Sequence, residues 1–352
     1  MRFHLVVNLE RMVEDANMVD VLEHVTDMVK MADQAGFDIV WAAEHHALEM
    51  TIAPGPFQLL AHFAGCTDRI RLGTAVVVAA YWHPIKLAGE AALLDLISGG
   101  RLEFGIGKGA YQREFDRMSN GMAMNIGVPM MLEMVPALKG LWKGDYEHNG
   151  EYWQFPTSTS CPKPLQQPHP PIWVAARDPS TYASAIKEGY NIMSWAFTRG
   201  FEEVEKYKRQ FEDALAENPD VDRPKFMTMR HTGIYETAAD ADVFTDAIVR
   251  QGRQFENLFK TLAPVVNGFP QEPPLDLLTN QAEFTPENLR SNLILGTPDQ
   301  AVERLKRYEK VGVDSFCYNA SYGLPMEFQK SSLRLFINEV MPAFQDVNKV
   351  EA

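Results

Sequence analysis

Apolar runs rich in β-branched residues alternate with segments of helical periodicity along almost the whole chain. The apolar runs are mostly continuous, which is typical of parallel strands that are buried on both faces. Eight strands are predicted, at Phe3–Leu9, Phe37–Ala42, Ile70–Val78, Leu102–Ile106, Pro171–Ala176, Tyr190–Trp195, Lys225–Tyr235 and Val313–Asn319. Helices are predicted between and after them, at Val19–Ala35, Phe57–Thr67, Ile85–Leu96, Tyr182–Glu188, Phe201–Glu217, Ala238–Phe259, Pro298–Val311 and Pro325–Phe344.

This alternation predicts a closed barrel of the α/β class. Eight β–α units in one chain favour a TIM-like (β/α)8 barrel over an open parallel sheet. A hairpin is predicted for Tyr146–Phe155 around Asn149-Gly150. The segment Ala263–Pro286 is long and proline-rich, as mobile lids often are. No internal domain boundary is evident, so residues 1–352 are expected to form a single barrel domain with these two insertions.

Composition and charge narrow the range of partners. The chain has 33 Lys and Arg against 47 Asp and Glu, a formal net charge of −14, which is unfavourable for binding nucleic acid or an anionic membrane. The longest apolar stretch, Thr74–Trp82, has about nine residues, whereas a membrane helix needs roughly twenty. Cys66, Cys161 and Cys317 are far apart and form no C-x-x-C pair, which excludes a disulfide framework. A cytoplasmic protein is expected.

Chemistry in a parallel barrel is found at the carboxyl ends of the strands. Glu44-His45-His46 directly follows the second predicted strand. Imidazole titrates near neutral pH, so either histidine could act as a general acid or base, although packing or capping roles are equally open. A metal site is not predicted, because neither H-x-H nor H-E-x-x-H occurs and adjacent strand residues point in opposite directions.

Two further strand ends could bind a phosphate group. Gly105–Gly109 follows the fourth strand and includes Lys108, so glycine N–H groups and a positive charge would lie close together. Asp178-Pro179-Ser180-Thr181 begins a helix after the fifth strand, and a helix N-terminus attracts anions. A tight turn and simple helix capping are the alternatives. The aromatic residues Tyr111 and Trp195 could pack in the core or border a flat ring system.

Taken together, these segments resemble the bacterial luciferase-like flavin monooxygenases, in particular the catalytic luciferase subunit, over most of the chain. The resemblance is carried by Gly36–His46, Arg71–Val78 with His83-Pro84, Gly100–Tyr111, the Asp178–Thr181 helix start, Met193–Trp195, Leu295–Leu305 and Glu339–Phe344. It implies a TIM-like barrel that binds FMN and has a mobile lid at Ala263–Pro286.

The resemblance also assigns residues to the site. His45 matches the catalytic histidine of the family, with Glu44 and His46 completing its motif, and Gly107 stands where luciferase has a reactive cysteine. The peptide bond between Ala75 and Val76 matches a non-proline cis peptide in the flavin seat. Asp178 replaces a serine beside the phosphate, and Arg177 could compensate for its charge. The implied cofactor-binding residues are Ala75, Val76, Gly107, Lys108, Gly109, Tyr111, Arg177, Ser180, Thr181 and Trp195.

The implied activity is that of a two-component monooxygenase. Reduced FMN from a separate NAD(P)H:flavin reductase would react with O2 to give a flavin 4a-hydroperoxide, which inserts one oxygen atom into a small organic substrate. A homodimer through helices beside the second and third strands is expected by analogy. A deazaflavin-dependent oxidoreductase and a metal-dependent barrel hydrolase are the alternatives. The substrate is not named by the sequence, although Arg230, Arg250 and Arg253 could reach an anionic group unless they lie on the surface.

Overall fold

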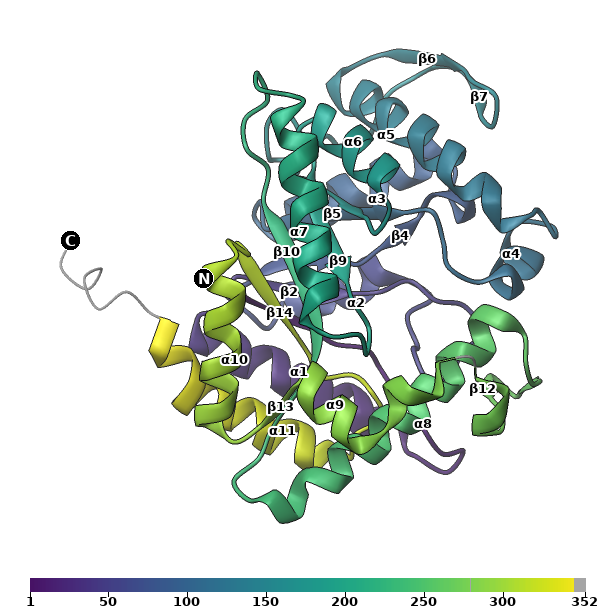
Figure 1. The fold of residues 1–352 in the computed structure, drawn as a ribbon. Helices are drawn as coiled ribbons and strands as arrows, with labels where there is room; N and C mark the ends of the chain where they lie inside the picture. Colours follow the sequence, from purple (N-terminus) through teal and green to yellow (C-terminus); the bar gives the residue numbers. More distant parts are fainter. Residues whose placement is uncertain (279, 345–352) are drawn as a thin grey trace.

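Eight parallel strands close into a barrel in the computed structural model, which describes residues 1–278 and 280–344 (Figure 1). The strands follow chain order around the barrel, and the last strand pairs with the first, with Leu5 opposite Tyr318. The strands are β1 (Arg2–Val6), β2 (Ile39–Ala42), β3 (Arg71–Thr74) continued by β4 (Val77–Val78), β5 (Leu102–Gly107), β8 (Ile172–Ala175), β9 (Asn191–Trp195), β10 (Phe226–Ile234) and β14 (Ser315–Asn319). The predicted (β/α)8 barrel is confirmed.

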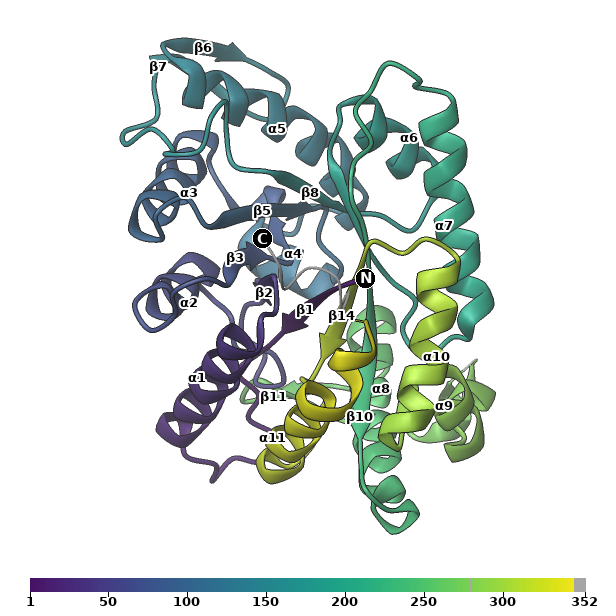
Figure 2. The same cartoon turned by 90° about the vertical axis from the view of Figure 1, so that its left-hand side faces the viewer.

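Helices cover the outside of the barrel (Figure 2). The first helix begins after Asn17, whose side chain accepts a hydrogen bond from the Val19 N–H, and ends at Gly36, whose φ of +86° suits glycine. The main helices are α1 (Met18–Ala35), α2 (Pro56–Ala64), α3 (Pro84–Ile97), α6 (Pro179–Lys187), α7 (Phe201–Ala216), α8 (Ala241–Lys260), α10 (Pro298–Lys310) and α11 (Met326–Leu335). The predicted last helix is divided, because a π turn (Phe336–Val340) and a 3-10 turn (Met341–Phe344) follow α11. Among the described residues, no helix is both long and apolar enough to cross a bilayer.

Several elements were not predicted from the sequence. The segment between the fourth predicted strand and the inserted hairpin, for which no helix was predicted, contains α4 (Gln112–Met118), a 3-10 turn (Met124–Ile126) and α5 (Gly127–Lys143). Pro136 lies inside α5 and obscures its periodicity. A short helix, α9 (Pro286–Asn292), and a short strand, β13 (Ile294–Gly296), were also missed. Strand β13 pairs with the end of the long β10, where Thr232 is opposite Ile294.

The inserted hairpin is present, with a longer turn than the Asn149-Gly150 signal suggests. Strand β6 (Tyr146–Asn149) pairs with β7 (Gln154–Ser158), and Asn149 is opposite Gln154, so four residues form the turn. The carboxylate of Glu133 on α5 accepts hydrogen bonds from three backbone N–H groups of this turn and contacts His148 Nε2 at 3.0 Å. One half-buried carboxylate on a helix therefore fixes the turn.

The segment predicted as a lid is docked against the barrel. It contains the hairpin strands β11 (Val265–Val266) and β12 (Phe269–Pro270) and 3-10 turns at Leu275–Leu277 and Gln281–Phe284, while Thr279 lies outside the described residues. The Gly268 carbonyl accepts a hydrogen bond from the Glu49 N–H (2.8 Å), in the loop that follows His45. Glu49 also forms a two-bond pair with Arg11, whose guanidinium lies over the Phe269 ring. These contacts join the segment to the loops after β1 and β2.

Indole rings fill the interior of the barrel below the carboxyl ends of the strands. Trp41 and Trp173 pack edge to face with ring centroids 5.3 Å apart, and Trp41 Nε1 donates a hydrogen bond to His4 Nδ1 (3.2 Å). Burial, with smaller contributions from Lys225 and Arg2, lowers the pKa of His4 to about 3, so its ring is neutral and accepts this bond.

The contact between β3 and Trp41 gives a stability test. A Cβ atom built on Gly73 would lie 2.1 Å from the Trp41 ring, so alanine there must displace the indole. We expect Gly73→Ala to lower the free energy of unfolding by about 1–3 kcal/mol, the usual cost of overpacking. Urea denaturation measures it. Gly144→Ala is the matched control, because its Cβ would meet no atom within 4 Å, and an equal loss in both variants would contradict the explanation.

Candidate active site

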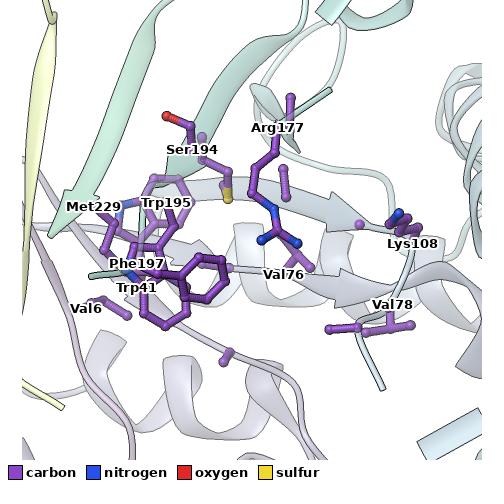
Figure 3. Close-up of a pocket in the computed structure, with 18 of the residues that line it drawn as sticks. Val6, Trp41, Val76, Val78, Lys108, Arg177, Ser194, Trp195, Phe197 and Met229 are labelled. Carbon is purple, nitrogen blue, oxygen red and sulfur yellow. The ribbon is translucent and has the colours of Figure 1, made fainter. Parts of the chain in front are cut away.

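A cavity of about 540 Å3 opens at the carboxyl ends of the barrel strands. Its volume is in the range of small-molecule sites. Every barrel strand or the loop that follows it contributes to the lining, as do α4, α6, α7 and α8. Figure 3 shows the cavity with Lys108 at one end and Trp195, Phe197 and Met229 at the other, while Arg177 projects between them.

Most of the residues assigned from the sequence line this one cavity. They are Glu44, His45, Ala75, Val76, Gly107, Lys108, Gly109, Tyr111, Arg177, Thr181 and Trp195. The peptide bond between Ala75 and Val76 is cis. Two assigned residues, His46 and Ser180, are not in the lining. His46 packs against Tyr81 instead, and the Ser180 hydroxyl is bonded to Asp178. Among the described residues, no group of three or more potential metal ligands is found.

Glu44 holds the end of β2 in place. Its side chain is almost completely buried and accepts hydrogen bonds from the Val78 N–H (2.7 Å) and Trp82 Nε1 (2.9 Å). It also contacts His46 Nε2 at 3.0 Å. Since all these partners are protein groups, Glu44 ties β4 and the following turn to the histidine pair. The geometry favours a structural role for Glu44 and His46.

His45 is oriented by a carboxylate that the sequence analysis missed. Glu114, in the first turn of α4, is 1% exposed and lies with both oxygens 3.2 Å from His45 Nδ1. It also accepts the His46 N–H at 2.7 Å. A carboxylate beside Nδ1 favours the tautomer with the proton on that nitrogen. Nε2 of His45 is thereby left as the acceptor nitrogen, available to a molecule in the cavity.

Four positively charged side chains line the cavity. They are Lys108, Arg177, Arg199 and Lys206, and they lie there together with the carboxylates Asp178 and Glu203. Arg199 and Lys206 are paired with Glu203, at 3.1 and 3.3 Å. The Arg177 guanidinium lies 4.9 Å from the centre of the Phe197 ring. Four cations and two carboxylates leave a positive balance, which favours an anionic group.

Asp178 caps the N-terminus of α6, which was expected to bind a phosphate. Its carboxylate accepts hydrogen bonds from the Ser180 hydroxyl (2.6 Å), the Thr181 hydroxyl (2.8 Å) and the Thr181 N–H (3.0 Å). Burial opposes its ionisation, but these bonds and the charge of Lys108 prevail and lower its pKa. Simple capping, the alternative noted from the sequence, is therefore what this structure shows, and any anion here depends on the neighbouring side chains.

Aromatic rings surround the other end of the cavity. Trp195 ends β9 and Phe197 follows it, Phe255 and Phe259 come from α8, and Tyr111 follows β5. The ring centroid of Trp195 lies 4.1 Å from that of Phe197 and 5.7 Å from that of Phe255. The ring centroids of Tyr111 and Phe259 are 5.0 Å apart. We call these five side chains the aromatic box. The ring centroids of Tyr111 and His45 are 5.3 Å apart, so the box adjoins the candidate catalytic histidine.

Several functional candidates gave no recognisable signal in the sequence. Phe255 and Phe259 lie on α8 and look like ordinary core positions of an amphipathic helix. Glu114 lies in a stretch where no helix was predicted. Arg230 was considered a possible anion ligand or a surface residue, and it lies neither on the surface nor in the cavity lining. It is fully buried, and its guanidinium donates hydrogen bonds to the carbonyls of Arg199 and Asn292.

Comparisons with known proteins agree with this geometry. The profile of the luciferase-like monooxygenase family matches residues 1–315. The oxygenase component of a flavin-dependent trigonelline monooxygenase from Acinetobacter baylyi is 42% identical, and the match covers 98% of this chain and 96% of that protein. The crystal structure of the monooxygenase RslO1 from Streptomyces bottropensis superposes with a TM-score of 0.83 at 25% identity, covering 98% of this chain and 100% of that one.

A lower similarity extends to a type II Baeyer–Villiger monooxygenase from Pseudomonas putida, solved in complex with FMN. It has a TM-score of 0.74 at 20% identity, covers 97% of this chain and 98% of that one, and supports the fold alone. The chain belongs to the luciferase-like monooxygenase family. The family, the barrel and the enzyme class expected from the sequence are thereby confirmed.

The contact between Glu114 and His45 predicts a specific defect. In Glu114→Gln the negative charge beside Nδ1 is lost, so His45 is no longer held in one tautomer. We expect kcat for monooxygenation to fall by about 10²–10⁴-fold, the usual contribution of a positioned acid or base. KM and flavin affinity are expected to change little, and steady-state kinetics separate these effects. Asp116→Asn removes an exposed carboxylate from the same helix and is the control. An unchanged kcat in Glu114→Gln would contradict this positioning role.

Proposed function

We propose that this protein is the oxygenase component of a two-component, FMN-dependent monooxygenase. It would receive reduced FMN from a separate NAD(P)H:flavin reductase and add one oxygen atom of O2 to a small organic substrate. The observation that carries the proposal is the single cavity that brings His45, held by Glu114, together with a positive end. The relative at 42% identity is itself named as an oxygenase component.

The cavity fits a flavin phosphate at one end and a flat ring in the middle. Lys108 and Arg177 are the residues proposed to hold the phosphate, with Arg199 and Lys206 adding to the positive field. Gly107 keeps the wall open, because a Cβ there would lie 2.5 Å from the Val76 side chain. When bound, reduced flavin supplies the electrons that activate O2. The protein supplies binding, orientation and exclusion of water.

His45 is proposed to hold and deliver the proton that oxygen transfer requires. Its Nδ1 faces Glu114, so Nε2 is the nitrogen that would accept or donate a proton at the substrate side. The carboxylate stabilises the ring when it becomes positively charged. The docked segment Ala263–Pro286 is proposed to act as the lid, since the hydrogen bond from the Glu49 N–H to the Gly268 carbonyl joins it to the loop that follows His45.

A homodimer in the cytoplasm is proposed as the working state. Leu93, Leu96 and Ile97 on α3 are 49%, 42% and 54% exposed, and clustered apolar side chains of this kind are typical of subunit contacts. The three cysteines are unpaired, which suits a reducing compartment. Sedimentation of the purified chain tests the dimer.

Oxygen incorporation tests the activity. The purified chain, supplied with reduced FMN and 18O2, is expected to place one labelled atom in the product of an accepted substrate. His45→Ala should bind FMN as before, form little product and release the consumed oxygen as hydrogen peroxide. Hydride transfer from a reduced deazaflavin without O2 uptake would contradict the proposal and favour the deazaflavin alternative. Catalytic NAD(P)H oxidation by the chain alone would exclude the separate reductase.

The phosphate assignment predicts a binding defect. Lys108→Ala removes a charge-assisted contact, which contributes about 1.5–3 kcal/mol, so we expect the Kd for FMN to rise by about 10–150-fold. Flavin fluorescence titration measures this. Lys187→Ala, in the last turn of α6 and outside the cavity lining, is the matched control. Equal FMN affinity in wild type and Lys108→Ala would show that Lys108 does not bind the phosphate.

A further inference from the structure

The aromatic box carries an inference about the substrate, which rests on the proposed function. We propose that the box binds a small, planar heteroaromatic cation that bears a hydrogen-bond acceptor, the chemistry of a pyridinium carboxylate. The rings would hold the charged ring, and Trp195 Nε1 would donate a hydrogen bond to the acceptor. This assigns the substrate to the end of the cavity opposite Lys108 (Figure 3).

The shape of the box suits a flat, single ring. Phe255 and Phe259 are nearly parallel, with an interplanar angle of 29°. Trp195 stands almost perpendicular to Phe255, at 80°, and Phe197 almost perpendicular to Phe259, at 87°. Faces and edges of rings therefore border the same space, and Met229 closes it from β10. Such a wall offers stacking to a planar molecule and little to a flexible aliphatic chain.

The charges around the box favour a cation over a neutral ring. Aromatic faces attract cations, and the Arg177 guanidinium over Phe197 shows this attraction within the protein. The ring centroid of the buried His231 lies 5.5 Å from that of Trp195. Burial, together with the charge of Arg230, lowers the pKa of His231 to about 3, so its ring is neutral at neutral pH. The buried carboxylate of Glu114 lies behind His45 on the side of Tyr111. The five side chains of the box carry no positive charge themselves, and the Arg177 guanidinium borders them over the Phe197 ring.

One polar atom in the box requires a partner. Trp195 Nε1 is buried and forms no hydrogen bond within the described residues. A buried donor without a partner costs about 1–3 kcal/mol, so a ligand that accepts this bond recovers that loss. A carboxylate is the strongest acceptor available to a small organic molecule. The Trp195 N–H is therefore expected to favour binding of a ring that bears a carboxylate over a ring without one.

Three probes separate the two parts of the inference. Trigonelline is a methylated pyridinium carboxylate, nicotinate has the same carboxylate on a ring without the fixed charge, and N-methylpyridinium has the charge without the carboxylate. Equilibrium dialysis against the FMN-loaded protein gives the Kd for each. We expect trigonelline to bind about tenfold or more tightly than either of the other two. Equal binding of trigonelline and nicotinate, or tighter binding of nicotinate, would overturn the proposal.

Variants test the assigned residues. Phe255→Leu and Phe259→Leu should weaken trigonelline binding about tenfold and leave nicotinate nearly unchanged. Trp195→Phe keeps the ring but removes the N–H, so it should weaken trigonelline and nicotinate but not N-methylpyridinium. Trp153→Phe, in the turn of the inserted hairpin, is the matched control. No selective loss in any of the three box variants would overturn the assignment.

FMN affinity in the same variants decides which molecule uses the box. An unchanged Kd for FMN supports a substrate site, whereas a parallel loss of FMN binding would give the box to the cofactor and overturn the inference. Failure of the proposed function has a different signature, because the wild-type protein would then bind no FMN or incorporate no oxygen into any substrate. Oxygen incorporation without any preference for the charged ring would refute this inference alone.

Discussion

The arrangement of the site depends on the contact between the buried carboxylate of Glu114 and the His45 ring. Glu114 accepts the His46 N–H and faces His45 Nδ1, so one side chain from α4 fixes both the backbone after β2 and the orientation of the imidazole. Charge-assisted bonds of this kind contribute about 1.5–3 kcal/mol each. Because Glu44 anchors the same backbone from the other side, through Val78 and Trp82, His45 has little freedom to move.

The filled half of the barrel explains why this cavity is where it is. Trp41 and Trp173 occupy the interior below the strand ends, and Gly73 is the residue that makes room for the Trp41 ring. A closed barrel of eight strands is just wide enough for side chains to fill. The space above the indoles is bordered by loops, whose residues are not constrained by the sheet and can differ in charge from one end of the cavity to the other.

The sequence was sufficient for the strands and for the residues that directly follow them. His45, Lys108 and Trp195 were recognisable because continuous apolar runs locate the strand ends, and the chemistry of a barrel is found there. Glu114 and Phe255 were not, because they are brought to the site by helices whose position relative to the barrel depends on tertiary packing. The helix α5, next to α4, was missed for a different reason, since Pro136 inside it obscures its pattern.

The capping of α6 by Asp178 changes how an anion can be recognised in this protein. A free helix N-terminus binds phosphate through fixed N–H groups, but here the Thr181 N–H and two hydroxyls are already bonded to a carboxylate of the same charge as the ligand. Recognition must therefore come from long cationic side chains such as Lys108 and Arg177, which retain conformational freedom until a ligand orders them. A site built in this way binds through charge more than through rigid geometry, which suits the proposed delivery of reduced FMN by a separate reductase.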